Sequence, residues 1–304
     1  MFVATLIAAD GLEDAVVERA RQSLSFPDTK AEAVWLDAGA ACDIVFDLGD
    51  MGRASGVGDD GVTLAHIWLD DMFRGIDVVV QPLASRAKRL LIADMDSTMI
   101  TVECIDELAD YAGLKPRIAA ITEAAMRGEL DFAGALDARV ALLKGLDAGA
   151  IDRCREERVR LMPGARTLVR TMKARGATTV LVSGGFTAFA DPVGAEIGFD
   201  RVIANRLEIA GDALAGAVAK PIVDAGTKLA TLNAVRDELG LELDATLAVG
   251  DGANDLPMIQ AAGLGVAFHA KPVVAAAAAA RIDHGDLTAL LWAQGIPRAE
   301  WITG

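Results

Sequence analysis

Residues 89–109 read RLLIADMDSTMITVECIDELA, an apolar run that leads directly into charged side chains. Asp94 and Asp96 stand at the end of the run, and Glu103 follows one short loop later. Carboxylates crowded at a strand end repel one another and lose solvation, so a purely structural role is disfavoured unless positive charge lies among them. The stretch therefore predicts a buried strand with a chemically active carboxyl end.

The chain around this stretch repeats the same kind of strand. Further apolar runs occur at 177–185 (ATTVLVSGG), 245–252 (ATLAVGDG) and 263–270 (GLGVAFHA), with helical patterns between them. Such runs are typical of a parallel sheet covered on both faces, a Rossmann-like α/β core. An all-helical insertion at about 104–162 follows the first strand, so we expect it to form a cap over the site. Residues 201–218 predict a hairpin that turns at Gly211-Asp212.

The first 84 residues have a different pattern. Their apolar periodicity predicts a β-α-β-β-α-β order, that of a ferredoxin-like α+β module. Pro82 and the polar segment SRAKR (85–89) then mark a boundary. We therefore predict a domain at 1–84 and a second at 85–304 that includes the helical cap.

Composition limits the partners of this chain. The 304 residues carry 29 Lys plus Arg against 44 Asp plus Glu, a formal net charge of −15. Nucleic acids and anionic membranes bind clustered basic charge, so neither is expected as a partner. The N-terminus lacks a signal-peptide pattern, and no window holds the roughly 20 apolar residues of a membrane span. The three cysteines have no disulfide or zinc spacing, and we expect a cytoplasmic protein.

Polar residues follow each predicted strand of the second domain. Asp94 and Asp96 lie at the mouth of one strand, where one carboxylate can attack while the other handles a proton. Ser183 and Gly184 can present a hydroxyl and a backbone N–H to an anion. Lys228 begins a helix, where anions are already favoured. The segment VGDGANDLPMI adds Asp251, Asn254 and Asp255, oxygen ligands that suit a hard cation such as Mg²⁺.

These four motifs, in this order, resemble those of the haloacid dehalogenase-like phosphatases, over roughly residues 89–285. Within that superfamily the chain is most similar to the phosphoserine phosphatase family, because DMDST is followed by ECIDELA and the insertion carries MRGELDFAGALDARVALLKG. The one departure is Met95, where Phe is frequent. The resemblance implies Mg²⁺-dependent hydrolysis of O-phospho-L-serine through an aspartyl-phosphate, the last step of serine biosynthesis.

The resemblance also implies a role for each site residue. Asp94 is the nucleophile and Asp96 the acid and base, and the metal is held by Asp94, the Asp96 carbonyl and Asp251. The phosphate oxygens are stabilised by Ser183, the Gly184 N–H and Lys228. Asn254 and Asp255 orient Lys228 and the water molecules bound to the metal. Glu103 and Arg139 grip the amino-acid end of the substrate, and Met126 and Phe132 line the pocket.

Two alternatives stay open. The chain could act on another small phosphomonoester, such as phosphothreonine or phosphohomoserine, as a phosphatase or phosphotransferase. It could instead be an amino-acid sensor with a vestigial phosphatase half, because the order of the first 84 residues resembles ACT-type regulatory domains, which bind amino acids and often form dimers. For this N-terminal domain, a structural role or homodimer formation is the alternative to ligand sensing.

Overall fold

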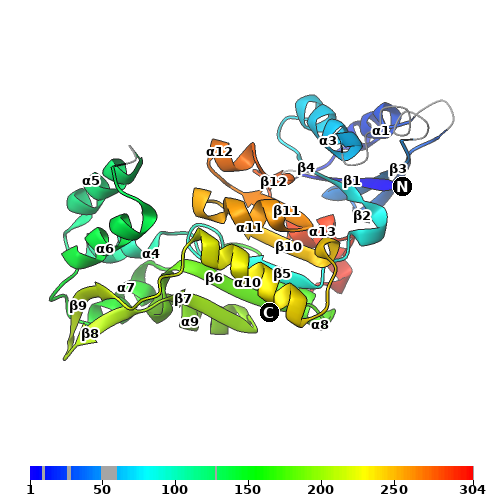
Figure 1. Cartoon of the computed structure of the whole chain (residues 1–304). Coiled ribbons are helices and arrows are strands. Elements are labelled where there is room, and N and C mark those ends of the chain that lie inside the picture. The colour runs from blue at the N-terminus through cyan, green and yellow to red at the C-terminus, as the bar shows by residue number, and fades with distance from the viewer. Residues whose placement is uncertain (9–10, 26–28, 49–59, 127–128, 304) are drawn as a thin grey trace.

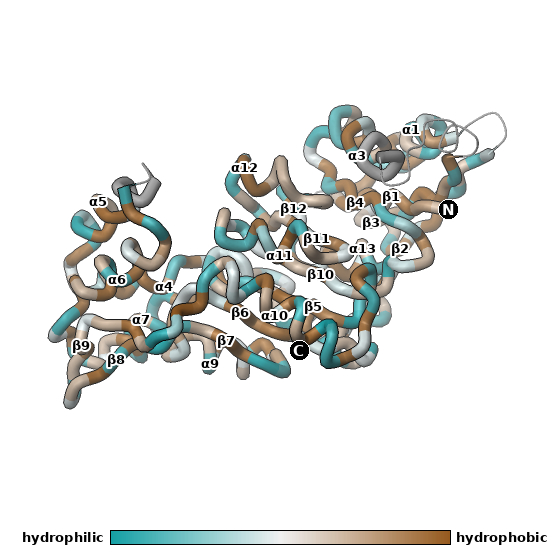
Figure 2. The backbone as a smooth tube through the Cα atoms, in the orientation of Figure 1, coloured by the Kyte–Doolittle hydropathy of each residue, from teal (hydrophilic) through white to brown (hydrophobic). Residues whose placement is uncertain are grey.

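The computed structural model describes residues 1–8, 11–25, 29–48, 60–126 and 129–303, with the backbone alone for 60–64 and 123–126. Figure 1 shows a central parallel sheet with the N-terminal module at one end and a group of helices at the other. Hydrophobic residues follow the central strands β5 and β6, and hydrophilic residues gather in connecting turns (Figure 2). Among the described residues, no helix combines the length and apolar character needed to cross a membrane.

The N-terminal module is an antiparallel sheet with helices on one face. It contains β1 (Phe2–Ile7), α1 (Asp14–Ser23), β2 (Glu32–Asp37), β3 (Ala41–Phe46), α3 (Asp60–Met72) and β4 (Asp77–Pro82). The strand order is β2-β3-β1-β4, which confirms the β-α-β-β-α-β prediction. Leu6 and Ile44 share one core cluster with Val17 of α1 and Leu69 of α3. This face of the sheet is therefore closed by its own helices.

The central sheet has six parallel strands in the order β12-β11-β10-β5-β6-β7. The strands are β5 (Leu90–Ala93), β6 (Thr178–Phe186), β7 (Arg201–Asn205), β10 (Thr246–Gly250), β11 (Leu264–Phe268) and β12 (Ala280–Ile282). Successive residues of β5 enter different cores: Leu90 and Ile92 join one cluster, and Leu91 and Ala93 join another. Both faces of the sheet are thus buried, which explains the continuous apolar strands and confirms the predicted fold class.

Helices cover the two faces of this sheet. The first cluster includes residues of α10 (Ala225–Glu238) and α11 (Leu256–Ala261), and the short α12 (Pro272–Ala275) lies on the same side. The second includes residues of α8 (Ala165–Ala174), α9 (Thr187–Ile197) and α13 (Ala289–Ala293). The strand ends that carry the predicted motifs are left free of these layers.

The predicted hairpin at 201–218 is wrong in its first part. Arg201–Asn205 is β7, an outer strand that pairs in parallel with β6. The hairpin itself consists of β8 (Leu207–Ala210) and β9 (Ala213–Val218), with the predicted turn at Gly211-Asp212. Parallel and antiparallel pairing use the same apolar residues, so sequence pattern alone could not separate the two strands.

The insertion is helical, as predicted. It comprises α4 (Cys104–Tyr111), α5 (Lys115–Met126), α6 (Phe132–Leu142) and α7 (Gly149–Arg158). Asp131 accepts a hydrogen bond from the Gly134 N–H at 2.8 Å and so caps α6. The β8–β9 hairpin extends this unit, because the N–H groups of Gly145 and Ala148 donate to carbonyls of the hairpin. Figure 1 places these elements together, away from the N-terminal module.

Candidate active site

The predicted site residues meet at the carboxyl ends of β5, β6 and β10, beneath the cap helices. A cavity of about 390 Å³ opens there. Nine of the predicted residues line it: Asp94, Asp96, Glu103, Phe132, Arg139, Ser183, Gly184, Asp251 and Asn254. Lys228 and Asp255 lie below the cavity floor and are fully buried. Met126 ends α5, but its side chain is outside the described residues, so its predicted place in the pocket stays a prediction.

Lys228 supplies the positive charge that the crowded carboxylates require. Its Nζ lies 2.6 Å from Asp94 Oδ1 and 2.6 Å from Asp255 Oδ1. Burial by itself would lower the pKa of Lys228, but the two carboxylates reverse the effect and raise it, so the ammonium stays charged. Burial and the charge of Asp255 raise the pKa of Asp94, while Lys228 opposes them. Asp94 is therefore a buried carboxylate that depends on a neighbouring cation.

Asp96 has a different environment. Burial and the charge of Glu103 raise the pKa of Asp96 to about 7, although Oδ1 accepts a hydrogen bond from the Cys104 N–H at 3.2 Å. A carboxyl group with this pKa can both donate and accept a proton near neutral pH. Asp94 is held against a lysine and Asp96 is poised for proton transfer, so the two carboxylates can divide the work as the sequence suggested.

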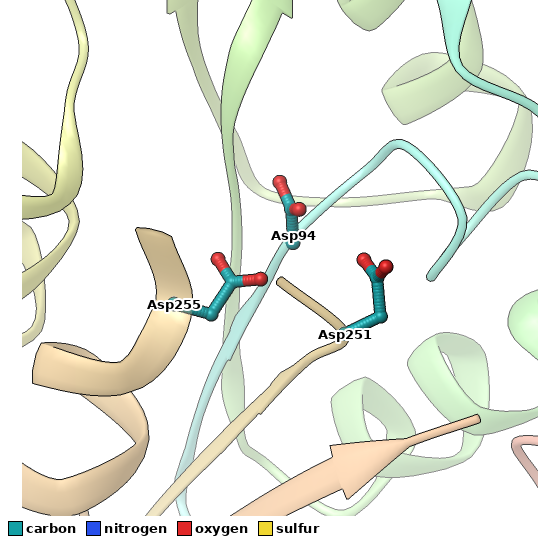
Figure 3. A group of neighbouring side chains, drawn as sticks. All are labelled: Asp94, Asp251 and Asp255. Atoms are coloured by element: carbon teal, nitrogen blue, oxygen red, sulfur yellow. The ribbon is translucent and has the colours of Figure 1, made fainter. Parts of the chain in front are cut away.

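Three carboxylates come together from separate segments: Asp94 after β5, Asp251 after β10, and Asp255 at the start of α11 (Figure 3). One oxygen atom from each lies within 4.8 Å of the others. Both oxygens of Asp255 are engaged, by Lys228 and by the Gly252 N–H. Burial, with the charges of Asp255 and Glu103, raises the pKa of Asp251 to about 6, because Lys271 and the Thr98 hydroxyl, which donates at 3.3 Å, only partly oppose them. Asp94 and Asp251 therefore fit a hard dication, with Asp255 as support.

The turn after Ser183 brings backbone to the cavity. The register between β6 and β7 shifts between Ser183 and Phe186, and the Gly185 N–H donates to Ser183 Oγ at 2.8 Å. A Cβ atom at Gly185 would lie 2.7 Å from Asp96 Oδ2, so only glycine leaves room for that carboxylate. The local bulge thus places Ser183, Gly184 and Gly185 in the cavity lining beside the two aspartates.

Asn205 is a site residue that sequence reasoning missed. It is 2% exposed, and its Nδ2 donates to the Gly184 carbonyl at 2.8 Å. Its Oδ1 accepts from the Val223 N–H at 2.7 Å. The amide thereby ties the glycine turn to the segment before α10. The sequence feature that could have identified Asn205 is its position as a polar residue at the end of a half-buried strand.

The cap contributes Glu103, Phe132 and Arg139. Ser97, whose φ of 56° is left-handed, donates from its hydroxyl to Glu103 Oε1 at 3.0 Å. Arg139 donates from Nε to the Ala135 carbonyl at 3.3 Å, which leaves its outer nitrogens for other partners. Phe132 Cζ would lie 3.2 Å from a Cβ atom at Gly184, so its ring lies over the glycine turn. The cap therefore adds one anionic, one cationic and one aromatic side chain to the cavity.

Further lining residues were not predicted. They are Ile105, Asp106, Thr122, Leu136, Gly185, Phe186, Gly252, Ala253 and Lys271. Lys271 follows the end of β11, the fourth strand predicted from sequence, and that position was the signal that could have identified it.

Comparison with known proteins agrees with this geometry. Residues 91–260 match the haloacid dehalogenase-like hydrolase family, and the chain belongs to that family. Among curated relatives, it is 49% identical over 74% of its length to phosphoserine phosphatase from Streptomyces coelicolor, and 45% identical over 71% to that from Polaromonas sp.. The aligned region is 55% of the first relative and 94% of the second, so the chain spans about half the length of the former.

Solved structures extend the similarity. A HAD family hydrolase from Salmonella enterica serovar Typhi has a TM-score of 0.83 and 28% identity, over 96% of this chain and 98% of that one. A phospho-aspartyl intermediate analogue of phosphoserine phosphatase has a TM-score of 0.63 and 36% identity, over 68% of this chain and 98% of that one. The first match includes the N-terminal module, so the whole arrangement recurs in another protein.

Proposed function

We propose that this protein is a Mg²⁺-dependent phosphoserine phosphatase that hydrolyses O-phospho-L-serine to L-serine and phosphate. The observation that carries the proposal is the single cavity in which Asp94, paired with buried Lys228, faces Glu103 and Arg139 from the cap. The similarity to proteins named phosphoserine phosphatase supports the choice of substrate. In this proposal the reaction is the last step of serine biosynthesis and takes place in the cytoplasm.

The proposed reaction has two displacements. An oxygen of Asp94 attacks phosphorus while the bond from phosphorus to the serine oxygen breaks, and protonated Asp96 gives its proton to that oxygen. Water then attacks the aspartyl-phosphate, Asp96 takes the proton, and phosphate leaves with the Asp94 carboxylate restored. Asp96 is suited to both steps because burial and Glu103 raise its pKa to about 7.

Charge stabilisation comes from groups that surround the phosphate. Ser183 Oγ and the Gly184 N–H would offer hydrogen bonds to its oxygens, and Lys228 offsets the charge of Asp94. A Mg²⁺ ion held by Asp94, the Asp96 carbonyl and Asp251 would supply Lewis-acid stabilisation of the anionic phosphate. Asn254 and Asp255 support this arrangement, Asp255 through its bond to Lys228.

Recognition of the amino-acid end rests on the cap. The guanidinium of Arg139 suits a bidentate contact with the substrate carboxylate, and Glu103 suits its ammonium. Phe132, at the glycine turn, and Met126, at the end of α5, would enclose the side-chain carbon. Closure of the helical unit at about 104–162 over the substrate would then exclude water from the phosphate.

We also propose that residues 1–84 form an ACT-like domain through which two copies associate, with the phosphatase domain at 85–304. In the described residues, β2 pairs only with β3, and Val34 and Trp35 on it are exposed. An unpaired strand edge with apolar side chains supports edge-to-edge pairing. Light scattering of wild type and Val34→Lys tests this: a dimer that becomes a monomer supports it, and a wild-type monomer contradicts it.

The function is tested by phosphate release from phosphoserine, phosphothreonine, phosphohomoserine and a sugar phosphate, with Mg²⁺ or EDTA. We expect Mg²⁺-dependent turnover that prefers phosphoserine, and a loss of at least about 10³-fold in kcat for Asp94→Asn, because the nucleophile is removed. Asp212→Asn, an exposed aspartate at the hairpin turn, is the matched control.

Each result has a distinct meaning. Preference for another phosphoamino acid would move the substrate assignment while leaving the aspartate chemistry in place. Preference for a sugar phosphate would remove the roles of Glu103 and Arg139. Tight serine binding without turnover of any substrate would contradict the enzyme and favour an amino-acid sensor.

A further inference from the structure

Lys271 lines the cavity together with Asp94, Asp96 and Asp251, and none of the proposed roles uses it. It is the residue before α12, and its N–H donates to the Asp251 carbonyl at 3.4 Å. Its own carbonyl accepts from the N–H groups of Val274 and Ala275. The backbone of Lys271 is therefore held at the rim of the site, next to a proposed metal ligand.

The side chain of Lys271 can meet a ligand. It is exposed, and within the described part of the chain no hydrogen bond or ion pair holds its ammonium, although its charge favours ionisation of Asp251 by lowering the pKa of that carboxyl. Lys228, by contrast, is fully buried and already pairs with Asp94 and Asp255. Among the described residues that line the cavity, the cations are Arg139 from the cap and Lys271 from the core.

The site has an electrostatic difficulty that Lys271 can relieve. A phosphomonoester dianion must approach a molecule of net charge −15 and enter a cavity lined by four carboxylates or more, including Asp94, Asp96, Glu103 and Asp251. Potentials of this sign slow the association of anions, and a cation at the mouth of a cleft restores it. Lys228 cannot act at this stage, because it lies beneath the cavity and has no exposed surface.

We propose that Lys271 captures the phosphate group of the substrate at the mouth of the cavity and guides it to Asp94. This inference rests on the proposed function in that the ligand is a phosphomonoester. Because Arg139 lines the cavity from the cap and Lys271 lines it from the core, the two would orient the substrate at entrance, phosphate toward the core and carboxylate toward the cap. The residue acts on binding rather than on bond breaking, since Lys228 and Ser183 are placed at the nucleophile.

The test compares wild type with Lys271→Gln and Lys271→Arg at saturating Mg²⁺. Phosphoserine hydrolysis is measured between about 0.01 M and about 0.15 M ionic strength, where the Debye length falls from about 30 Å to about 8 Å. At low salt we expect kcat/KM of Lys271→Gln to fall about tenfold, mainly through KM, with kcat within about twofold. The difference should shrink as salt rises, and Lys271→Arg should recover most of it.

Lys30→Gln is the matched control, because it removes the same charge from an exposed position in the N-terminal module. It should leave kcat/KM and its salt dependence unchanged. Equal behaviour of the two Gln variants would overturn the inference, as would a salt-independent loss confined to kcat. Thermal unfolding should differ little among the variants, since the Lys271 side chain is exposed and acts on Asp251 through charge alone, without a hydrogen bond in the described structure.

Binding of inorganic phosphate separates this inference from the proposed function. Calorimetry with Mg²⁺ should show that Lys271→Gln weakens phosphate binding by a factor similar to its loss in kcat/KM. If wild type fails to hydrolyse phosphoserine but binds phosphate through Lys271, the substrate assignment falls and the capture role stands. If phosphate binds both proteins equally, the capture role falls whatever the substrate.

Discussion

At the scale of the residue, Asp94 and Asp96 show how neighbouring groups give two side chains of the same type different proton affinities. Asp94 lies 2.6 Å from Lys228, while Asp96 is near Glu103 and accepts a hydrogen bond from the Cys104 N–H. Burial and Glu103 therefore raise the pKa of Asp96 to about 7, far above its ordinary value of 3.8. The raised pKa, on which the proposed role of Asp96 as proton carrier depends, should also cost the folded state stability.

Without Mg²⁺, Asp96→Asn should stabilise the fold at pH 8. A carboxyl whose pKa is raised on folding holds its proton longer in the folded state, so its cost is absent below about pH 4 and grows until about pH 7. We expect a gain on the order of 1–3 kcal/mol at pH 8 that disappears near pH 4. Denaturant unfolding across this pH range measures it.

Asp212→Asn again serves as the control, because Asp212 is exposed at the hairpin turn. It should change the free energy of unfolding little at any pH. A stability gain in Asp96→Asn that did not vary with pH would show that ionisation of Asp96 is not its source.

At the scale of the element, the decisive feature is the irregular end of β6. The register shift there, with glycines at 184 and 185, brings the backbone of the turn into the cavity lining beside the aspartates. Asn205, at the end of β7, bridges the Gly184 carbonyl and the Val223 N–H. One buried amide therefore holds two loops of the site in a fixed relation.

Asn205→Ala should lower kcat/KM by roughly 10–100-fold. The reason is that the glycine turn loses its support and shifts away from the proposed phosphate site. The stability loss should be about 1–3 kcal/mol, as buried backbone groups lose their partner. Asn233→Ala, on the half-buried face of α10, is the control and should be near neutral. Full activity in Asn205→Ala, with a normal KM, would contradict the supporting role.

At the scale of the whole molecule, the N-terminal sheet is joined to the central domain by buried polar contacts. Its face opposite α1 and α3 carries Asp43 and Asp77, which are 3% exposed. Asp77 accepts hydrogen bonds from the N–H groups of three successive residues, 283–285, after β12. Arg86 pairs with Asp43 at 2.5 Å and donates to the Trp292 carbonyl. These bonds hold the two parts together as one body.

Asp77→Asn should therefore destabilise the interface. An amide has one acceptor oxygen in place of two, so N–H groups of 283–285 would be left buried without partners, at a cost of about 1–3 kcal/mol. We expect a lower Tm and faster proteolysis near residues 83–89. The control is Asp71→Asn, at an exposed position of α3. Equal proteolysis of both variants would show that Asp77 does not hold the interface.

This interface also limits how copies could associate. The sheet face that ACT-like domains could offer to a partner is occupied here by α13 and the segment after β12. Of the two edge strands in the described sheet, β4 is mostly buried, whereas β2 is mostly exposed and open to pairing. Association through the N-terminal module, if the proposal holds, would therefore use a strand edge rather than a face.

Local pattern was sufficient to predict the α/β core, the helical cap, the β-α-β-β-α-β module and the motif residues from Asp94 to Asp255. Strand periodicity and motif order are properties of short segments, and parallel strands bring their carboxyl ends to one edge. Only the tertiary structure revealed that Arg201–Asn205 joins the central sheet and that Asn205 supports the glycine turn. It also revealed that Lys271 lines the cavity and that Asp77 binds the segment after β12. Each of these depends on contacts between residues distant in sequence, and their energies are decided by burial and geometry that no local pattern contains.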